Sequence, residues 1–219
     1  MADRATRLVL VRHGQTSANT ARLLSGSTDL PLDATGERQA QLVAQRGANQ
    51  IDAHVLVSSP LVRARSTAAA IGNMTGLAIQ ESPDLREVHF GDFEGLTVAQ
   101  VEEHHPHIAV QMLDPHDTEL RWPNGDHMHE FYQRTQQAFA AIAEEHFSKT
   151  VVVVAHGAVI GGYLRYATGQ PINAWRTFSL RNCSLSLVDV IDGAPRVVTA
   201  NDCDHLDDGI ALAEEPQRP

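Results

Sequence analysis

The chain has 219 residues, of which 42% are hydrophobic and 20% are charged, and its formal net charge is -10 at pH 7. This composition favours one folded domain over a disordered chain, and the acidic balance argues against a nucleic-acid partner, which would need a basic face. There are two cysteines, no apolar run of transmembrane length and no signal-peptide pattern. The sequence therefore predicts a cytoplasmic protein without a disulfide framework or a membrane partner.

Apolar and polar segments alternate along the first part of the chain. Short β-branched runs predict strands, and apolar residues at helical spacing predict helices. Segments rich in Gly, Ser, Thr, Asn and Asp predict loops. In chain order, these patterns predict a strand at 7–12, a loop at 14–34, a helix at 36–48, a strand at 54–57, a helix at 60–76 and a short strand at 78–80.

The chain changes character over residues 88–125, which contain histidines, prolines and acidic residues but no long apolar run. We interpret about 92–125 as a helical cap inserted into a single domain, 1–219. Strands that alternate with helices predict an α/β fold with three layers, in which helices flank a mostly parallel central sheet. From the cap onward, the predicted elements are helices at 97–104, 108–113 and 126–147, a strand at 150–155, a helix at 158–168 and strands at 184–190 and 196–200. Asp126 is a possible N-cap of the helix at 126–147.

Polar residues follow the predicted strands where each strand ends. Arg12 and His13 follow the first strand, Arg63 lies one turn into the helix after the second, and His156 follows the VVVV strand. Glu87 lies in the loop after the short third strand. Because ligands of α/β sheets bind at the carboxyl ends of the strands, we expect these side chains to lie close together.

Such a group suits phosphoryl transfer. Two guanidinium groups match phosphate oxygens, one histidine can serve as a nucleophile, and a second histidine can stabilise the developing charge. A carboxylic acid can protonate the leaving oxygen and then deprotonate water. Each residue taken alone could have a structural role or lie on the solvated surface. These interpretations become less favourable than a shared catalytic role because all five residues are expected at one edge of the sheet.

Five stretches of the sequence, in order, resemble the motifs of the histidine phosphatase superfamily, which includes phosphatases and phosphoglycerate mutases. They are LVLVRHGQTSAN, GSTDLPLDATGERQA, VSSPLVRARSTA, LREVHFGDFEG and VVVVAHGAVI. The resemblance runs from about Arg7 to His205. It implies the catalytic residues His13, Glu87, Arg12, Arg63 and His156, phosphate contacts from Arg12, Asn19, Ser25, Arg63, His156 and Gly157, and a structural role for His205.

The sequence departs from the family pattern at a few positions. Leu23 stands where the family often has an arginine, with Arg22 one place earlier. Where the family often has Pro-Gly-Gly-Glu-Ser, Asp126 replaces the glutamate and His127 replaces the serine. Ser25 occupies a variable pocket position. These changes leave the expected chemistry intact and bear on the choice of substrate.

Histidines gather in and beside the cap, where they could bind a metal ion or form a solvated surface. Imidazole is a common metal ligand, but no spacing here matches a zinc pattern and the catalytic set needs no metal. We therefore expect a solvated cap surface, no metal and no cofactor. The histidines are His104, His105, His107, His116, His127 and His129.

Three functions fit the predicted site. A phosphoglycerate mutase must hold a second phosphate and a carboxylate, yet between Glu87 and His156 the cations are Arg121, Arg134 and Lys149, among many acidic residues. We therefore expect a phosphoric monoester hydrolase of the histidine acid phosphatase type, acting through a phosphohistidine on a small phosphorylated metabolite. The alternative is a cofactor-dependent phosphoglycerate mutase. A non-catalytic phospho-ligand binder ranks last, because the nucleophile and the acid are both present. The sequence leaves the particular substrate and the oligomeric state open.

Overall fold

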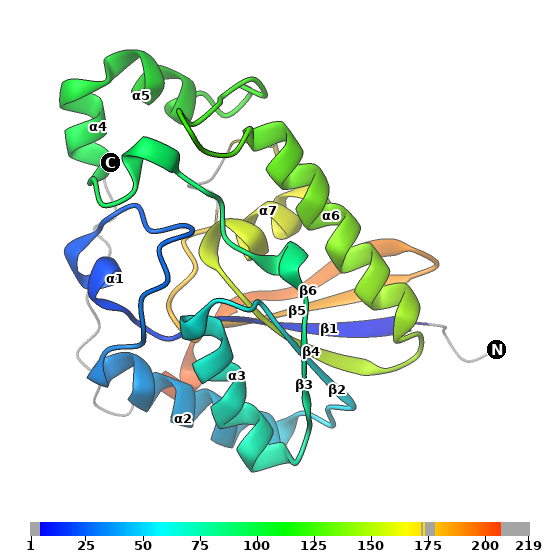
Figure 1. Ribbon diagram of the computed structural model, residues 1–219. Coiled ribbons are helices and arrows are strands. Elements are labelled where there is room, and N and C mark those ends of the chain that lie inside the picture. Colours follow the sequence, from blue (N-terminus) through cyan, green and yellow to red (C-terminus); the bar gives the residue numbers. More distant parts are fainter. Residues whose placement is uncertain (1–4, 172, 174–177, 207–219) are drawn as a thin grey trace.

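A single mostly parallel sheet lies at the centre of the structure (Figure 1). The computed structural model describes residues 5–171, 173 and 178–206. Across these residues the strand order is β3-β2-β4-β1-β5-β6, with β5 and β6 antiparallel to their neighbours and the other strands parallel. The strands are β1 (Ala5–Arg12), β2 (Val55–Ser58), β3 (Ile79–Glu81), β4 (Thr150–Ala155), β5 (Leu185–Ile191) and β6 (Ala194–Asp202).

Helices cover both faces of this sheet, and the predicted three-layer α/β fold is confirmed (Figure 1). α2 and α3 pack on one face, and α6 and α7 pack on the other. α4 and α5 lie together on the side where β1 ends and α1 begins. The helices are α1 (Ser17–Ala21), α2 (Ala34–Gln50), α3 (Val62–Thr75), α4 (Val98–His104), α5 (Pro106–Leu113), α6 (Met128–Glu145) and α7 (Gly157–Ala167).

Two hydrophobic clusters, one on each face, hold the layers together. Leu8 and Leu10 of β1 belong to the cluster that includes Phe139 of α6. Val9 and Val11 belong to the cluster under α2 and α3. Successive side chains of a strand point to opposite faces, so the unbroken apolar run in β1 is what a strand covered on both sides requires.

The prediction that Asp126 caps the long helix is wrong. α6 begins at Met128, and His127 occupies the cap position without a side-chain capping bond. The Asp126 carboxylate instead accepts a hydrogen bond of 3.0 Å from the backbone N–H of His89. A partner distant in sequence has thus replaced the local helix N–H group as donor to this side chain.

Other differences from the sequence prediction are local. The predicted loop 14–34 contains the short helix α1, which Thr16 caps through its side chain. α3 begins at Val62, two residues after Pro60. β6 covers Ala194–Asp202 and is longer than predicted. The single domain and the bounds of the cap stay predictions. In the described part of the chain, none of the helices has the length and apolar character needed to cross a membrane.

The histidines of the cap region are not all solvated. The ring of His105 lies 4.7 Å from the ring of Phe93 between centroids, and the side chain of His127 is 9% exposed. The structure holds no cluster of three or more His, Cys, Asp or Glu suited to a metal ion within residues 5–171, 173 and 178–206. The exposed histidines are His104, His107 and His116.

Candidate active site

The sheet brings the predicted site residues to one edge. β1 and β4 are parallel neighbours that end together, at Arg12 and Ala155, so His13 and His156 follow side by side. Their ring centroids are 5.1 Å apart. β2 pairs with the other side of β4, and Arg63 of α3 follows it and is 2% exposed. The placement expected from the strand ends is therefore found.

The surroundings of His13 determine which ring nitrogen carries its proton. Nδ1 lies 2.7 Å from the carbonyl oxygen of Gly14, and because a carbonyl can only accept, Nδ1 is the protonated nitrogen. Nε2 of the neutral ring therefore keeps its lone pair. Burial, followed by the positive charges of Arg63 and Arg12, holds the pKa of His13 well below its ordinary value.

Two glycines let the loop after β1 pack against α2. A Cβ atom on Gly14 would lie 2.5 Å from the carbonyl oxygen of Gly36, and one on Gly36 would lie 2.1 Å from the carbonyl oxygen of Gln15. Thr67 of α3 accepts a hydrogen bond of 3.0 Å from the Gly14 N–H. The backbone beside His13 is thereby fixed from two helices.

Arg63 ties His156 to the loop that precedes α2. Its Nε–H donates to Nδ1 of His156 at 3.2 Å, and its Nη groups donate to the carbonyl oxygens of Thr28 at 3.0 Å and Gly26 at 2.7 Å. The proton of His156 is therefore on Nε2, which lies 2.7 Å from Oγ of Ser59. Burial, followed by the Arg63 charge, lowers the pKa of His156 well below its ordinary value.

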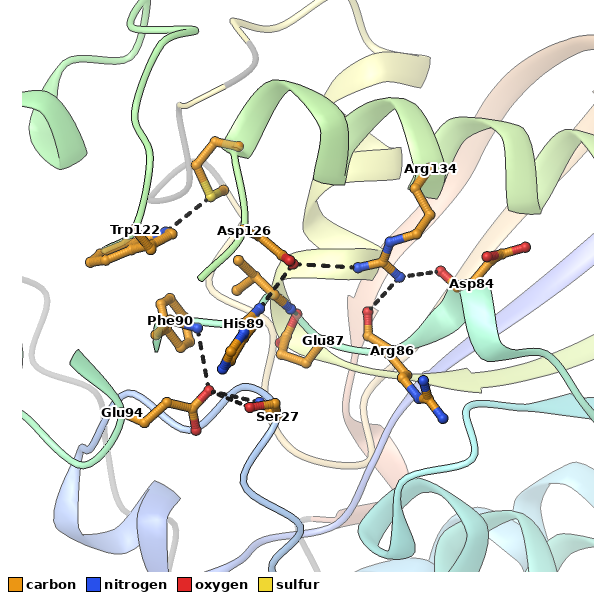
Figure 2. Close-up of polar contacts among 12 residues, drawn as sticks. Ser27, Asp84, Arg86, Glu87, His89, Phe90, Glu94, Trp122, Asp126 and Arg134 are labelled. Atoms are coloured by element: carbon orange, nitrogen blue, oxygen red, sulfur yellow. Dashed lines mark hydrogen bonds and ion pairs between the residues drawn. The ribbon is translucent and has the colours of Figure 1, made fainter. Parts of the chain in front are cut away.

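The carboxylate of Glu94 organises the loop that binds Arg63, and Figure 2 shows its contacts with Ser27 of this loop and with the backbone N–H of Phe90. Its oxygens accept hydrogen bonds from the backbone N–H groups of Gly26 at 3.2 Å, Ser27 at 2.8 Å and Thr28 at 3.0 Å, and from the Thr28 hydroxyl. Burial alone would raise the pKa of Glu94, but hydrogen bonds from Thr28, Ser27 and Phe90 lower it below its ordinary value. No sequence pattern marks Glu94 for this role, because its partners lie far from it in the chain.

We expect Glu94→Gln to weaken phosphate binding. The glutamine amide group replaces one acceptor oxygen with a donor, so a backbone N–H of the 26–28 loop loses its partner and Arg63 loses its fixed surroundings. A hydrogen bond to a charged group contributes about 1.5–3 kcal/mol, which corresponds to a rise of roughly tenfold or more in the inhibition constant of inorganic phosphate. Glu103→Gln, at an exposed position of α4, is the matched control. An unchanged constant in the Glu94 variant would contradict the prediction.

Glu87 lies at the N-terminus of α7. Its Oε2 accepts a hydrogen bond of 3.0 Å from the N–H of Ala158, and its Oε1 accepts one of 3.1 Å from the N–H of Val88. Burial raises the pKa of Glu87 despite these bonds and the nearby arginines. A Cβ atom on Gly157 would lie 3.5 Å from Nε of Arg12 and 3.9 Å from Oε2 of Glu87, so Arg12 and Glu87 face the same turn.

The two remaining predicted phosphate ligands differ in their contacts. Oδ1 of Asn19 accepts bonds from the Thr16 N–H at 3.0 Å and from Nδ2 of Asn182 at 3.2 Å. Within the described residues, Nδ2 of Asn19 donates to no protein group, so it can donate to a ligand. Ser25 contributes its carbonyl oxygen, 3.5 Å from Nη2 of Arg63.

Asn182 and His205 support the loop after β1. Asn182 donates from Nδ2 to the carbonyl oxygen of His13 at 3.0 Å, and no sequence pattern marked it. His205, which the family resemblance made structural, lies with Nε2 2.9 Å from the carbonyl oxygen of Cys183. Cys183 in turn donates its N–H to the carbonyl oxygen of Arg12 at 2.9 Å.

Comparison with known proteins identifies the family. The model of the histidine phosphatase superfamily (branch 1) matches residues 8–203. The probable phosphoglycerate mutase GpmB of Serratia proteamaculans is 36% identical over 206 residues, which cover 92% of this chain and 95% of that protein. The chain belongs to the histidine phosphatase superfamily, as its motifs indicated.

Several solved structures of similar fold are named as phosphatases. A putative alpha-ribazole-5'-P phosphatase from Escherichia coli matches with a TM-score of 0.79 and 27% identity, over 90% of this chain and 96% of that one. Phosphoserine phosphatase from Entamoeba histolytica, in complex with 3-phosphoglyceric acid, matches with a TM-score of 0.81 and 26% identity, over 92% of this chain and 99% of that one. The relatives' names therefore include both mutase and phosphatase activities.

Proposed function

We propose that the protein hydrolyses small phosphate monoesters through a phosphohistidine at His13. The observation that carries this proposal is the contact between Nδ1 of His13 and the carbonyl oxygen of Gly14. The Nδ1–H of His13 is held by the Gly14 carbonyl oxygen at 2.7 Å, so the lone pair on Nε2 is free to attack phosphorus. Its lowered pKa keeps the ring neutral near pH 7.

In the first step, Nε2 of His13 forms a bond to phosphorus while the bond from phosphorus to the ester oxygen breaks. Protonated Glu87 gives its proton to the leaving oxygen, and the raised pKa of Glu87 favours the protonated form that this requires. Arg12, Arg63 and the Nδ2 group of Asn19 stabilise the phosphoryl oxygens. His156 contributes beside them by orienting Arg63.

In the second step, water attacks the phosphohistidine. Glu87, now ionised, takes a proton from the water as the new oxygen–phosphorus bond forms and the bond from phosphorus to Nε2 breaks. The products are inorganic phosphate, neutral His13 and protonated Glu87, so the site returns to its starting state.

The second candidate is a cofactor-dependent phosphoglycerate mutase, which the name of the Serratia relative favours. A mutase needs cations above the site for a second phosphate and a carboxylate. Arg121 lies 3.9 Å from Glu130, Arg134 donates to backbone carbonyl oxygens, and Lys149 precedes β4 at the opposite edge of the sheet. These placements support hydrolysis over mutase activity.

The test is a turnover screen of the purified protein against a panel of phosphate monoesters, beside 3-phosphoglycerate with and without 2,3-bisphosphoglycerate. We expect inorganic phosphate from at least one monoester without a bisphosphate primer. Primed formation of 2-phosphoglycerate much faster than phosphate release from any monoester would replace the hydrolase with the mutase.

We expect activity to survive metal chelation. Arg12 and Arg63 supply the positive field that a metal ion supplies in other phosphatases. Turnover after dialysis against EDTA should equal that of the untreated protein, and vanadate should inhibit both samples. Loss of turnover on chelation, with recovery on adding zinc or magnesium, would contradict this prediction.

A further inference from the structure

We propose that Asp126 and Arg134 are positioning residues for Glu87, an inference that rests on the proposed function. Both come from α6 or the segment that leads into it, and both hold the backbone of the loop that carries Glu87 (Figure 2). They bind this loop on either side of Glu87.

Arg134 holds the loop on the N-terminal side of Glu87. Its Nη1 donates to the carbonyl oxygen of Asp84 at 2.7 Å and to that of Arg86 at 3.0 Å. The guanidinium carbon lies 5.1 Å from the centre of the Phe131 ring, which adds a cation–π contact within α6. Nη1 of Arg134 thus sets the spacing between these two carbonyl groups. The second belongs to Arg86, the residue directly before Glu87.

Asp126 holds the loop on the C-terminal side of Glu87. Its N–H donates to the carbonyl oxygen of His89 at 2.8 Å, and its Oδ2 accepts from the N–H of His89 at 3.0 Å. The segments approach closely here, because a Cβ atom on Gly125 would lie 2.4 Å from the carbonyl oxygen of His89. Oδ2 of Asp126 also lies 3.7 Å from Nη2 of Arg134, so the two side chains support each other.

The polar contacts of Asp126 and Arg134 are separate from the apolar anchors of the same loop. Leu85 is 0% exposed and Val88 is 1% exposed, and both belong to the main hydrophobic cluster. These side chains attach the loop to the core, and Asp126 and Arg134 fix the orientation of its backbone between them. That orientation determines where the Glu87 carboxyl group points.

The expected consequence is selective. A misplaced general acid slows hydrolysis of a substrate whose leaving oxygen needs a proton. It has little effect on a substrate whose leaving group departs as an anion. Arg134→Met should therefore lower kcat for an alkyl phosphate such as phosphoserine by about 10–100-fold, the loss that a misplacement of about 1 Å can cause. The kcat for p-nitrophenyl phosphate and the inhibition constant of inorganic phosphate should change little.

Further variants separate positioning from a merely structural role. Asp126→Asn removes the charge facing Arg134 and should show the same substrate dependence, more weakly. Arg134→Lys keeps the charge and should recover part of the lost rate. Combined with Glu87→Gln, Arg134→Met should cause little further loss, because both changes act on the same proton transfer. If Arg134→Met does not fold, as judged by thermal unfolding, the other two single variants carry the test.

Arg121→Met is the matched control, because it removes the same charge from the segment before α6 at an exposed position that contacts Glu130. An equal loss for both substrates in Arg134→Met, or a fully additive loss with Glu87→Gln, would overturn the inference. If Glu87→Gln shows the substrate dependence and Arg134→Met does not, the inference fails and the proposed function stands. If the wild-type protein hydrolyses no monoester, both fail.

Discussion

Replacing His13 with alanine is expected to abolish turnover together with covalent labelling of the protein. The ring of His13 is the predicted acceptor of the phosphoryl group, and its Nε2 lone pair is set by the bond from Nδ1 to the Gly14 carbonyl oxygen. Loss of a catalytic nucleophile lowers kcat by roughly 10⁵-fold or more. Reaction of the variant with a ³²P-labelled monoester, followed by an alkaline quench that preserves phosphohistidine, measures both effects.

His107→Ala is the matched control for this experiment, because His107 is an exposed histidine of α5. That variant should keep both the label and the turnover of the wild-type protein. Label retained in His13→Ala would remove His13 from the role of nucleophile. Inorganic phosphate binding to His13→Ala should persist, because Arg12, Arg63 and Asn19 are unchanged.

Replacing Glu87 with glutamine is expected to give the second largest effect. The amide cannot give a proton to the leaving oxygen, and general-acid assistance contributes typically about 10²–10⁴-fold. The loss should be large for phosphoserine and small for p-nitrophenyl phosphate. An equal loss for both substrates would count against Glu87 as the acid, and Asp92 would be tested next.

The pH dependence gives an independent check on Glu87. Burial raises its pKa, so its protonated form persists to higher pH than that of an ordinary glutamate. Hydrolysis of phosphoserine should fall as the pH rises through this raised value, because the acid form is then lost. Glu87→Gln should show no such fall, and a fall that survives the substitution would assign it to another group.

The three-layer fold and the edge of the sheet that carries the site could be predicted, because the local sequence determines both. The apolar run at 150–155 is a strand in the structure with the predicted bounds, since a strand buried on both faces needs an unbroken apolar sequence. His13 and His156 are the residues that come directly after the strands β1 and β4. The carboxyl ends of parallel strands meet at one edge, so their proximity did not depend on any long-range contact.

The supporting residues could not be predicted, because distant segments determine their roles. Asp126 has the sequence signature of a helix cap, yet the His89 N–H binds its carboxylate. Glu94 binds a loop 66 residues or more earlier in the chain, and Asn182 contacts His13 across 169 residues. Composition and periodicity carry no information on contacts between such distant residues. The supporting roles of these residues can therefore be recognised only in the folded structure.

The most direct test of the account is the fate of the phosphoryl group on His13. The phosphoenzyme would be formed with a ³²P-labelled monoester, separated from substrate and chased in buffer with or without unlabelled 3-phosphoglycerate. We expect the label to appear as inorganic phosphate at the same rate in both samples. Label that passes to 3-phosphoglycerate in preference to water would contradict hydrolysis as the activity of this protein.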